Sequence, residues 1–234
     1  MEERITVGSC IVLLTGLSWA YLIHQNNQMA GMDMSGDFLY TFAMWAIMMG
    51  GMMAPSAAPV FLLYAKTRAT RGEGMTSPAV LLFGLGYLAV WTAFSVCAAL
   101  AQTGLHQAAL LSPAMQVASP RIAGAILIAA GAYQLTPWKL KCLTHCRSPL
   151  GFLMTGWRDG LLGAFQMGFS HGRFCVGCCW ALMGILFAVG VMNLVWVAVL
   201  TAVVLLEKVG PAGAIAARVA GVALVVFGVL RFFY

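Results

Sequence analysis

Residues 171–183 read HGRFCVGCCWALM, and the residues on both sides of them are almost entirely apolar. One histidine and three cysteines fall within nine residues of this stretch, at His171, Cys175, Cys178 and Cys179. If the stretch is helical, spacings of three and four residues place His171, Cys175 and one of the later cysteines on one face. The stretch therefore predicts a helix with a cluster of polar side chains in apolar surroundings.

The overall composition indicates the fold class. Of the 234 residues, 62% are hydrophobic and 9% are charged, and the mean hydropathy is +0.90. Such a chain lacks the polar surface of a soluble domain, so lipid must cover much of it. About 20 apolar residues span a bilayer, and this length recurs along the chain. The sequence predicts that residues 1–234 form a single all-α domain, a polytopic transmembrane helix bundle whose partner is the lipid bilayer.

Eight hydrophobic segments predict about eight spans. They cover residues 5–23, 38–65, 78–102, 119–137, 151–170, 174–191, 193–207 and 212–232. The sixth and seventh segments are short and nearly touch, so six or seven spans remain open. The first segment is expected to be a retained helix, because two glutamates spoil the basic start that a signal peptide needs.

Basic residues set the expected orientation. Loops 66–73 and 138–147 carry lysines and arginines, and the positive-inside rule places both loops in the cytoplasm. An even number of spans then puts both termini on the same side. Segment 24–37 and a turn at His171 are expected to lie outside.

A faint internal repeat predicts two halves. Residues 121–133 read RIAGAILIAAGAY, and residues 218–230 read RVAGVALVVFGVL. This similarity favours a four-plus-four parallel repeat, with halves 1–137 and 151–234 joined by the cytoplasmic loop 138–150.

Both repeated segments also carry glycines seven residues apart. Gly124 and Gly131 share one helix face, and so do Gly221 and Gly228. Small residues on one face let helix backbones approach closely. Helix packing alone explains these glycines.

The second hydrophobic segment is rich in methionine. Residues 44–59 read MWAIMMGGMMAPSAAP, with Met44, Met48 and Met52 on one helix face and Met49 and Met53 on a neighbouring face. Thioethers are soft ligands that bind Cu(I) and largely ignore Zn(II). The alternative is that methionine fills uneven helix interfaces. His24 and the loop residues Met29, Met32 and Met34 just upstream favour copper.

A second group of candidate ligands lies in the predicted cytoplasmic loop. Residues 139–147 read KLKCLTHCR and bring Cys142, His145 and Cys146 within five positions. Imidazole and thiolate ligands suit Cu(I) and Zn(II), so the group could form a second metal site or a hand-off point. The alternative is a basic loop that attracts anionic lipid.

Three motifs give the chain a resemblance to a known family. They are HGRFCVGCCWALM with the following GVMNLVWVAVLTAVVLLEK, YQLTPWKLKCLTHCRSPLGF, and MWAIMMGGMMAPSAAP, and the matching region is roughly residues 38–210. The chain resembles a bacterial family of predicted metal-binding integral membrane proteins, a domain of unknown function. The resemblance implies an inner-membrane protein with a metal site at the histidines and cysteines of the first two motifs, and it implies no reaction.

These observations leave three classes of function open. The first is a Cu(I) protein that binds the ion through His171, Cys175, Cys178 and Cys179, assisted by the methionine face, and transports it or delivers it to a partner. Zinc is the alternative metal, and a soluble periplasmic or cytoplasmic protein would donate or accept the ion. The second is a membrane oxidoreductase or metalloenzyme subunit that uses the same cysteines, and the third is a structural subunit of a membrane complex. No basic run alternates with aromatics, so nucleic acid is not an expected partner.

Overall fold

A computed structural model describes residues 2–28, 37–72, 76–112 and 115–233, and every element in these ranges is an α-helix. The prediction of an all-α fold is confirmed. The helices are α1 (Glu2–Gln28), α2 (Phe38–Thr70), α3 (Thr76–Gln107), α4 (Pro120–Gln134), α5 (Pro137–Arg147), α6 (Pro149–Gly156), α7 (Gly160–Gly184), α8 (Leu186–Val189), α9 (Leu194–Lys208) and α10 (Gly213–Phe233). Met29, Met32 and Met34 lie outside the described residues.

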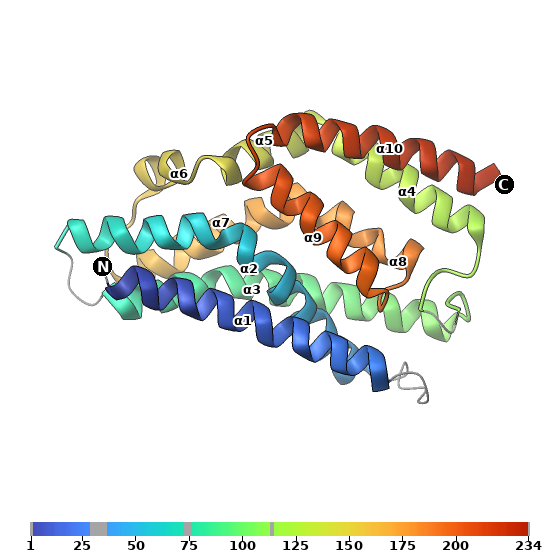
Figure 1. Ribbon diagram of the computed structural model, residues 1–234, viewed down its shortest axis with the longest axis horizontal. Helices are drawn as coiled ribbons and strands as arrows, with labels where there is room; N and C mark the ends of the chain where they lie inside the picture. The colour runs from blue at the N-terminus through green and yellow to red at the C-terminus, as the bar shows by residue number, and fades with distance from the viewer. Residues whose placement is uncertain (1, 29–36, 73–75, 113–114, 234) are drawn as a thin grey trace.

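The long helices lie along the long axis of the molecule (Figure 1). Within the described ranges, five of them are long and apolar enough to cross a membrane, namely α1, α2, α3, α7 with α8, and α10. Helices α4 and α9 have 15 residues each, fewer than the roughly 20 that a span needs. Eight spans are therefore not confirmed. The start of α1 and the end of α10 lie at opposite ends of the molecule, so the expectation that both termini share one side is wrong.

Helix α7 differs most from the prediction. It is continuous through His171, where a turn between two spans was expected, and it joins much of the fifth and sixth predicted segments. It starts at Gly160, whose positive φ of 76° suits glycine, and no proline interrupts it. The polar residues that suggested a turn are accommodated on different faces, because His171 is buried whereas Arg173 is exposed.

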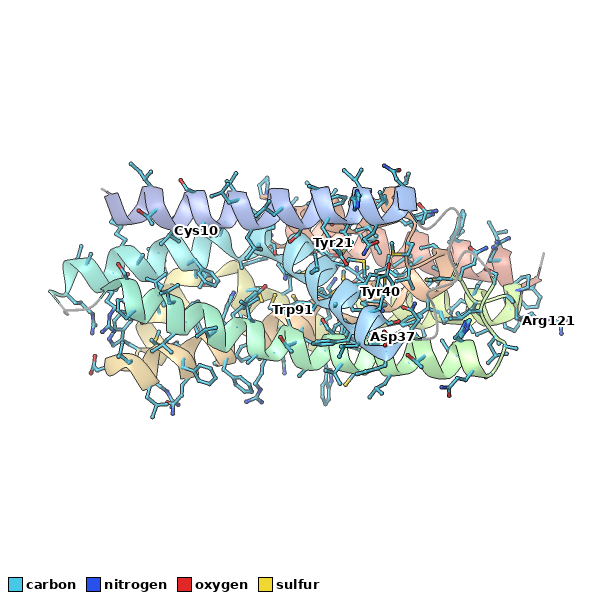
Figure 2. The ribbon with its side chains drawn as sticks, turned by 90° about the horizontal axis from the view of Figure 1, so that it is seen from below. Cys10, Tyr21, Asp37, Tyr40, Trp91 and Arg121 are labelled. Carbon is cyan, nitrogen blue, oxygen red and sulfur yellow. The ribbon has the colours of Figure 1, made fainter. Side chains whose placement is uncertain are left out.

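Helix α2 contains two prolines but remains helical throughout. Asp37 caps its start by accepting a hydrogen bond from the Leu39 backbone N–H at 2.9 Å (Figure 2). Pro55 and Pro59 lie inside the helix, where proline removes a backbone donor and crowds the preceding turn. Figure 1 shows α2 bent along its course. The bend accompanies a segment of methionines that is fully enclosed by neighbouring helices.

Helices α3 and α7 run parallel and touch backbone to backbone. A Cβ added to Gly168 of α7 would collide with the carbonyl group of Phe83, and one added to Gly86 of α3 would collide with the carbonyl of Phe165. Only glycine permits this approach at either position. The two helices therefore form a close pair, which holds the polar face of α7 next to α3.

Helices α4 and α10 form a second close pair, and they meet at the glycine faces that the sequence identified. A Cβ on Gly124 would lie 2.7 Å from the carbonyl oxygen of Gly228, and a Cβ on Gly131 would lie 2.7 Å from that of Gly221. The pairing joins the start of one segment to the end of the other, so these helices are antiparallel. In a parallel repeat they would run in the same direction, and the four-plus-four arrangement is not confirmed.

We expect Gly131→Ala to destabilise the protein by about 1–3 kcal/mol, because the added methyl group meets the backbone of α10 rather than a flexible side chain. The matched control is Gly104→Ala on the exposed side of α3, where nothing lies within 4 Å of the added atom. That control should be neutral or stabilising by about 0.5–1 kcal/mol. Thermal unfolding in detergent, followed by circular dichroism, measures both. Equal midpoints for the two variants would contradict the close α4–α10 contact.

Candidate metal centre

Helix α7 carries its histidine and cysteines into the interior. His171 is 2% exposed, Cys175 and Cys178 are 1% exposed, and Cys179 is fully buried. Their spacing places them on the part of α7 that faces other helices rather than the outside. The structure thus brings these four residues into the core of the bundle, halfway along a helix, and not to an outer turn.

Helix α5 brings the second group of candidate ligands to the same place. The Cys146 Sγ lies 3.9 Å from the Cys178 Sγ, and the His145 ring stacks on Phe174 with 3.8 Å between ring centroids. Gly177 leaves room for the Cys142 sulfur, which would lie 3.0 Å from a Cβ at that position. The expectation of separate groups on opposite sides of the membrane is wrong. The physical reason is that α7 has no turn at its histidine, so its cysteines sit at a depth that α5 reaches by folding back.

The methionine segment of α2 packs into the same core. Met44, Met48 and Met52 are buried in the same hydrophobic cluster as the cysteines of α7. The sulfur that reaches the cysteines is Met53 Sδ, 3.9 Å from Cys179 Sγ. Met53 belongs to the neighbouring face that the sequence also identified. His24 lies exposed on α1, and the structure does not bring it to the cysteines.

Lys208, the last residue of α9, enters the same cluster. Its Nζ lies 2.9 Å from Cys175 Sγ, 3.5 Å from Ser56 Oγ and 3.9 Å from both Cys179 Sγ and Met53 Sδ. The side chain is 7% exposed. Sequence reasoning missed this residue. The available signal was a pair of charges, Glu207 and Lys208, at the end of an apolar segment, where a charge is expensive unless it finds a partner.

Glu207, the residue before Lys208, belongs to a buried ion pair with Lys139. Lys139 Nζ lies 2.5 Å from the Glu207 Oε2, and the other carboxylate oxygen accepts a hydrogen bond from the Gln134 amide at 2.7 Å. Lys139 is fully buried and Glu207 is 1% exposed. Glu207 therefore does not reach the surface, although it lies near the end of an apolar segment.

Arg147 strengthens the same junction between α5 and α9. Its guanidinium donates to the carbonyl oxygens of Glu207 at 2.6 Å and Gly210 at 2.8 Å, which are otherwise unpaired at the end of a helix. Together with the ion pair, these bonds hold the end of α9 against α5. Cys146 of α5 lies near Cys178, and Lys208 of α9 lies near Cys175 and Cys179.

The thiols of α7 are hydrogen-bonded to their own helix. Cys178 Sγ and Cys179 Sγ donate to the Cys175 carbonyl oxygen at 3.1 and 2.9 Å, and the Tyr87 hydroxyl lies 3.1 Å from Cys175 Sγ. In the part of the chain that the structure describes, no three histidine, cysteine or acidic side chains are arranged to hold a metal ion. The donors are therefore gathered but engaged with other partners, and metal binding would require the sulfurs to turn.

His171 is the exception among these donors. Its ring packs near Tyr87 and Phe152, with centroid distances of 5.8 and 5.5 Å, but its Nδ1 is buried without a hydrogen-bond partner. A buried polar atom without a partner is uncommon and costs free energy. His171 lies one helical turn before Cys175 on α7, and an imidazole nitrogen is a donor that soft and borderline metals accept. The residues present thus fit a soft metal ion by their chemistry.

Burial shifts the pKa values of His145 and Cys142 on α5. Burial lowers the pKa of His145 below its usual value, so the ring is neutral at pH 7 and retains a free nitrogen lone pair. Burial raises the pKa of the Cys142 thiol, which favours the protonated form of that side chain. Both residues are only partly buried. They are therefore the members of the cluster that lie nearest to the outside.

Comparison with known proteins relates the chain to a copper-related family. No curated protein and no solved structure matches the chain significantly. A family model named PpoB2 and described as a copper chaperone matches residues 42–231, which contain α2 partly, α3 to α9 completely and nearly all of α10. The copper of that description is the metal that thiol and thioether donors favour, and the sequence alone had left copper and zinc open. Because the match covers well over half of the chain, this protein belongs to the PpoB2 copper chaperone family.

Proposed function

We propose that the protein binds Cu(I) in the buried cluster and transfers it to a partner protein. The observation that carries this proposal is the convergence of four cysteine sulfurs and one thioether from three helices, Cys146, Cys175, Cys178, Cys179 and Met53. His171 adds a buried imidazole nitrogen with no partner. Soft donors in an apolar enclosure suit a soft monovalent ion.

The donor set favours Cu(I) over Zn(II). In structural zinc sites four thiolate or neutral imidazole ligands surround the ion tetrahedrally, and thioethers contribute little. Here Met53 approaches Cys179, and a cationic ammonium stands within the cluster, which opposes a second positive charge. An ion of lower charge and greater affinity for sulfur fits these surroundings better.

The long apolar helices support a location in a bacterial inner membrane. The end of α2 and the start of α7 lie at one end of the bundle (Figure 1) and carry Lys66, Arg68, Arg71 and Arg158. The Arg71 guanidinium stacks on the Trp157 ring at 4.5 Å. The positive-inside rule then assigns this end to the cytoplasm. In that orientation α5 serves as the cytoplasmic approach to the cluster.

A path for copper exchange follows the cysteines of α5. Cys142 is partly exposed, Cys146 lies one helical turn further along, and Cys146 Sγ is 3.9 Å from the buried Cys178 Sγ. Cu(I) moves between proteins by ligand exchange among neighbouring thiols, which requires sulfurs within reach of one another. A soluble donor or acceptor would meet the protein at Cys142, and His145 beside it offers a neutral nitrogen.

Copper content of gently solubilised protein tests the proposal. The wild type loaded with Cu(I) under reducing conditions should retain about one ion per chain after desalting, and the Cys146/Cys175/Cys178→Ser variant should retain almost none. The matched control is Cys10/Cys97→Ser, because both of those cysteines are exposed whereas the cysteines of the triple variant are buried; Figure 2 labels Cys10 on α1. Equal copper in the wild type and the triple variant would refute the proposal.

A second candidate function is thiol redox chemistry, and the contacts of Cys175 favour it. A lysine ammonium next to a sulfur stabilises the thiolate, which is the reactive form of cysteine. All seven cysteines are free, and the Cys146–Cys178 pair is near enough to be joined by a modest shift. An oxidoreductase would form this disulfide reversibly without metal, and the copper retained after desalting would then be low in the wild type as well.

A further inference from the structure

We propose that the Lys208 ammonium is a tethered cation that occupies the copper position in the metal-free protein and leaves it when Cu(I) enters. The inference rests on the proposed function, because it concerns how the same cluster is loaded and emptied. It assigns to Lys208 the control of copper affinity and release.

The position of the ammonium carries the inference. Its Nζ has three sulfur neighbours, Cys175 at 2.9 Å and Cys179 and Met53 at 3.9 Å, and one oxygen neighbour, Ser56. These sulfurs are among the donors proposed to bind copper. A cation therefore already stands where their lone pairs converge, and the two cations cannot share that position.

The surroundings offer this ammonium little other compensation. Among the described residues no carboxylate pairs with Lys208, since Glu207 directs its carboxylate to Lys139. A buried charge without a counter-charge is strongly destabilising, so the electron-rich sulfurs must supply the compensation. Cys175, the nearest of them, is the natural counter-ion. The lysine holds negative charge in the cluster until a metal ion replaces it.

Exchange of one monovalent cation for another leaves the charge of the cluster unchanged. Cu(I) forms bonds to the Cys175 thiolate and to the neutral Met53 thioether, and the hydrogen bond from Nζ to Cys175 breaks, so no proton is released at these two sulfurs. The ammonium keeps its own proton. Lys208 ends α9 and has a flexible four-carbon stem, so its head can move towards the polar surface while the stem stays buried. A divalent ion would add a charge that this exchange does not offset.

The exchange gives the protein a means of releasing copper. A chaperone must give up its ion, and a tethered cation that returns to the sulfurs competes with copper at every dissociation step. Removing the charge should therefore tighten binding, whereas a residue that merely supported the fold would weaken binding when replaced.

The test measures Cu(I) affinity and release in full-length protein in detergent, by competition with a chromogenic Cu(I) chelator. Lys208→Gln and Lys208→Leu should bind Cu(I) about tenfold or more tightly than the wild type and release it more slowly by a similar factor. Lys208→Arg keeps the charge and should not tighten binding. The control Lys66→Gln removes an exposed lysine at the end of α2 and should change neither quantity.

Each outcome decides between the two proposals. Unchanged or weaker affinity in both neutral variants overturns the role of Lys208 while the wild type still binds copper. No copper binding in the wild type overturns the proposed function and this inference with it. If the neutral variants fail to fold, acetylation of Lys208 in the wild type is compared with and without Cu(I) by mass spectrometry. Faster acetylation with copper supports displacement, and an equal rate contradicts it.

Discussion

Replacing Cys178 alone by serine is expected to weaken Cu(I) binding by about a hundredfold or more, the largest effect of any single substitution proposed for this protein. Cys178 is 1% exposed and its Sγ is the atom that connects the cysteines of α7 with Cys146 of α5. Serine keeps the size and the hydrogen bond to the Cys175 carbonyl, but its hydroxyl is a hard donor with little affinity for Cu(I). The loss therefore reports coordination rather than packing.

Competition titration with a Cu(I) chelator measures this loss. Cys97→Ser, an exposed position on α3, serves as the matched control and should bind as tightly as the wild type. Thermal unfolding of both variants shows whether each remains folded. If a folded Cys178→Ser variant binds within about threefold of the wild type, Cys178 is no ligand and the cluster must hold copper without it.

Replacing Glu207 by glutamine should cost about 3–5 kcal/mol of stability, because it leaves the Lys139 ammonium buried without its counter-charge. Lys139→Met removes the opposite partner and should also be costly. The double variant Lys139→Met with Glu207→Leu replaces the ion pair by apolar groups, and it should recover most of the loss. Unfolding midpoints in detergent for the two single variants and the double variant give the coupling between the residues.

A surface ion pair would behave differently in this cycle. Exposed pairs contribute only about 0–1 kcal/mol, and their single variants differ little from the wild type. Small and additive effects at Lys139 and Glu207 would therefore contradict the buried junction between α5 and α9. The control Arg158→Gln, at an exposed position before α7, should remain close to the wild type.

Much of the fold could be predicted from composition and spacing. Long apolar runs predict helices because only a helix satisfies every backbone polar group in an apolar environment. The glycines of α4 and α10 predicted faces at which helix backbones approach closely, because a missing side chain allows backbone contact, and in the structure these two faces meet each other. The relative direction of the two helices could not be predicted, because glycines seven residues apart permit parallel and antiparallel packing equally.

The candidate site was predictable in its residues but not in its assembly. Spacings on α7 and α5 identify two groups of donors, yet nothing local indicates that Cys146 meets Cys178 across 32 positions of sequence. Polar residues near His171 suggested a turn, because a periodicity cannot distinguish a loop from a buried polar face. Lys208 was missed for a related reason: a charge at the end of an apolar segment usually reaches the membrane surface.

The backbone contact between α3 and α7 has a consequence for how the protein responds to its ion. The close contact at Gly86 and Gly168 leaves α3 and α7 little freedom to move relative to each other. Cys175, Cys178 and Cys179 therefore lie on one rigid helix pair. Helices α5 and α9 contact α7 through side chains, among them Cys146 and Lys208. We therefore expect α5 and α9 to shift when an ion binds, while α3 and α7 keep their positions.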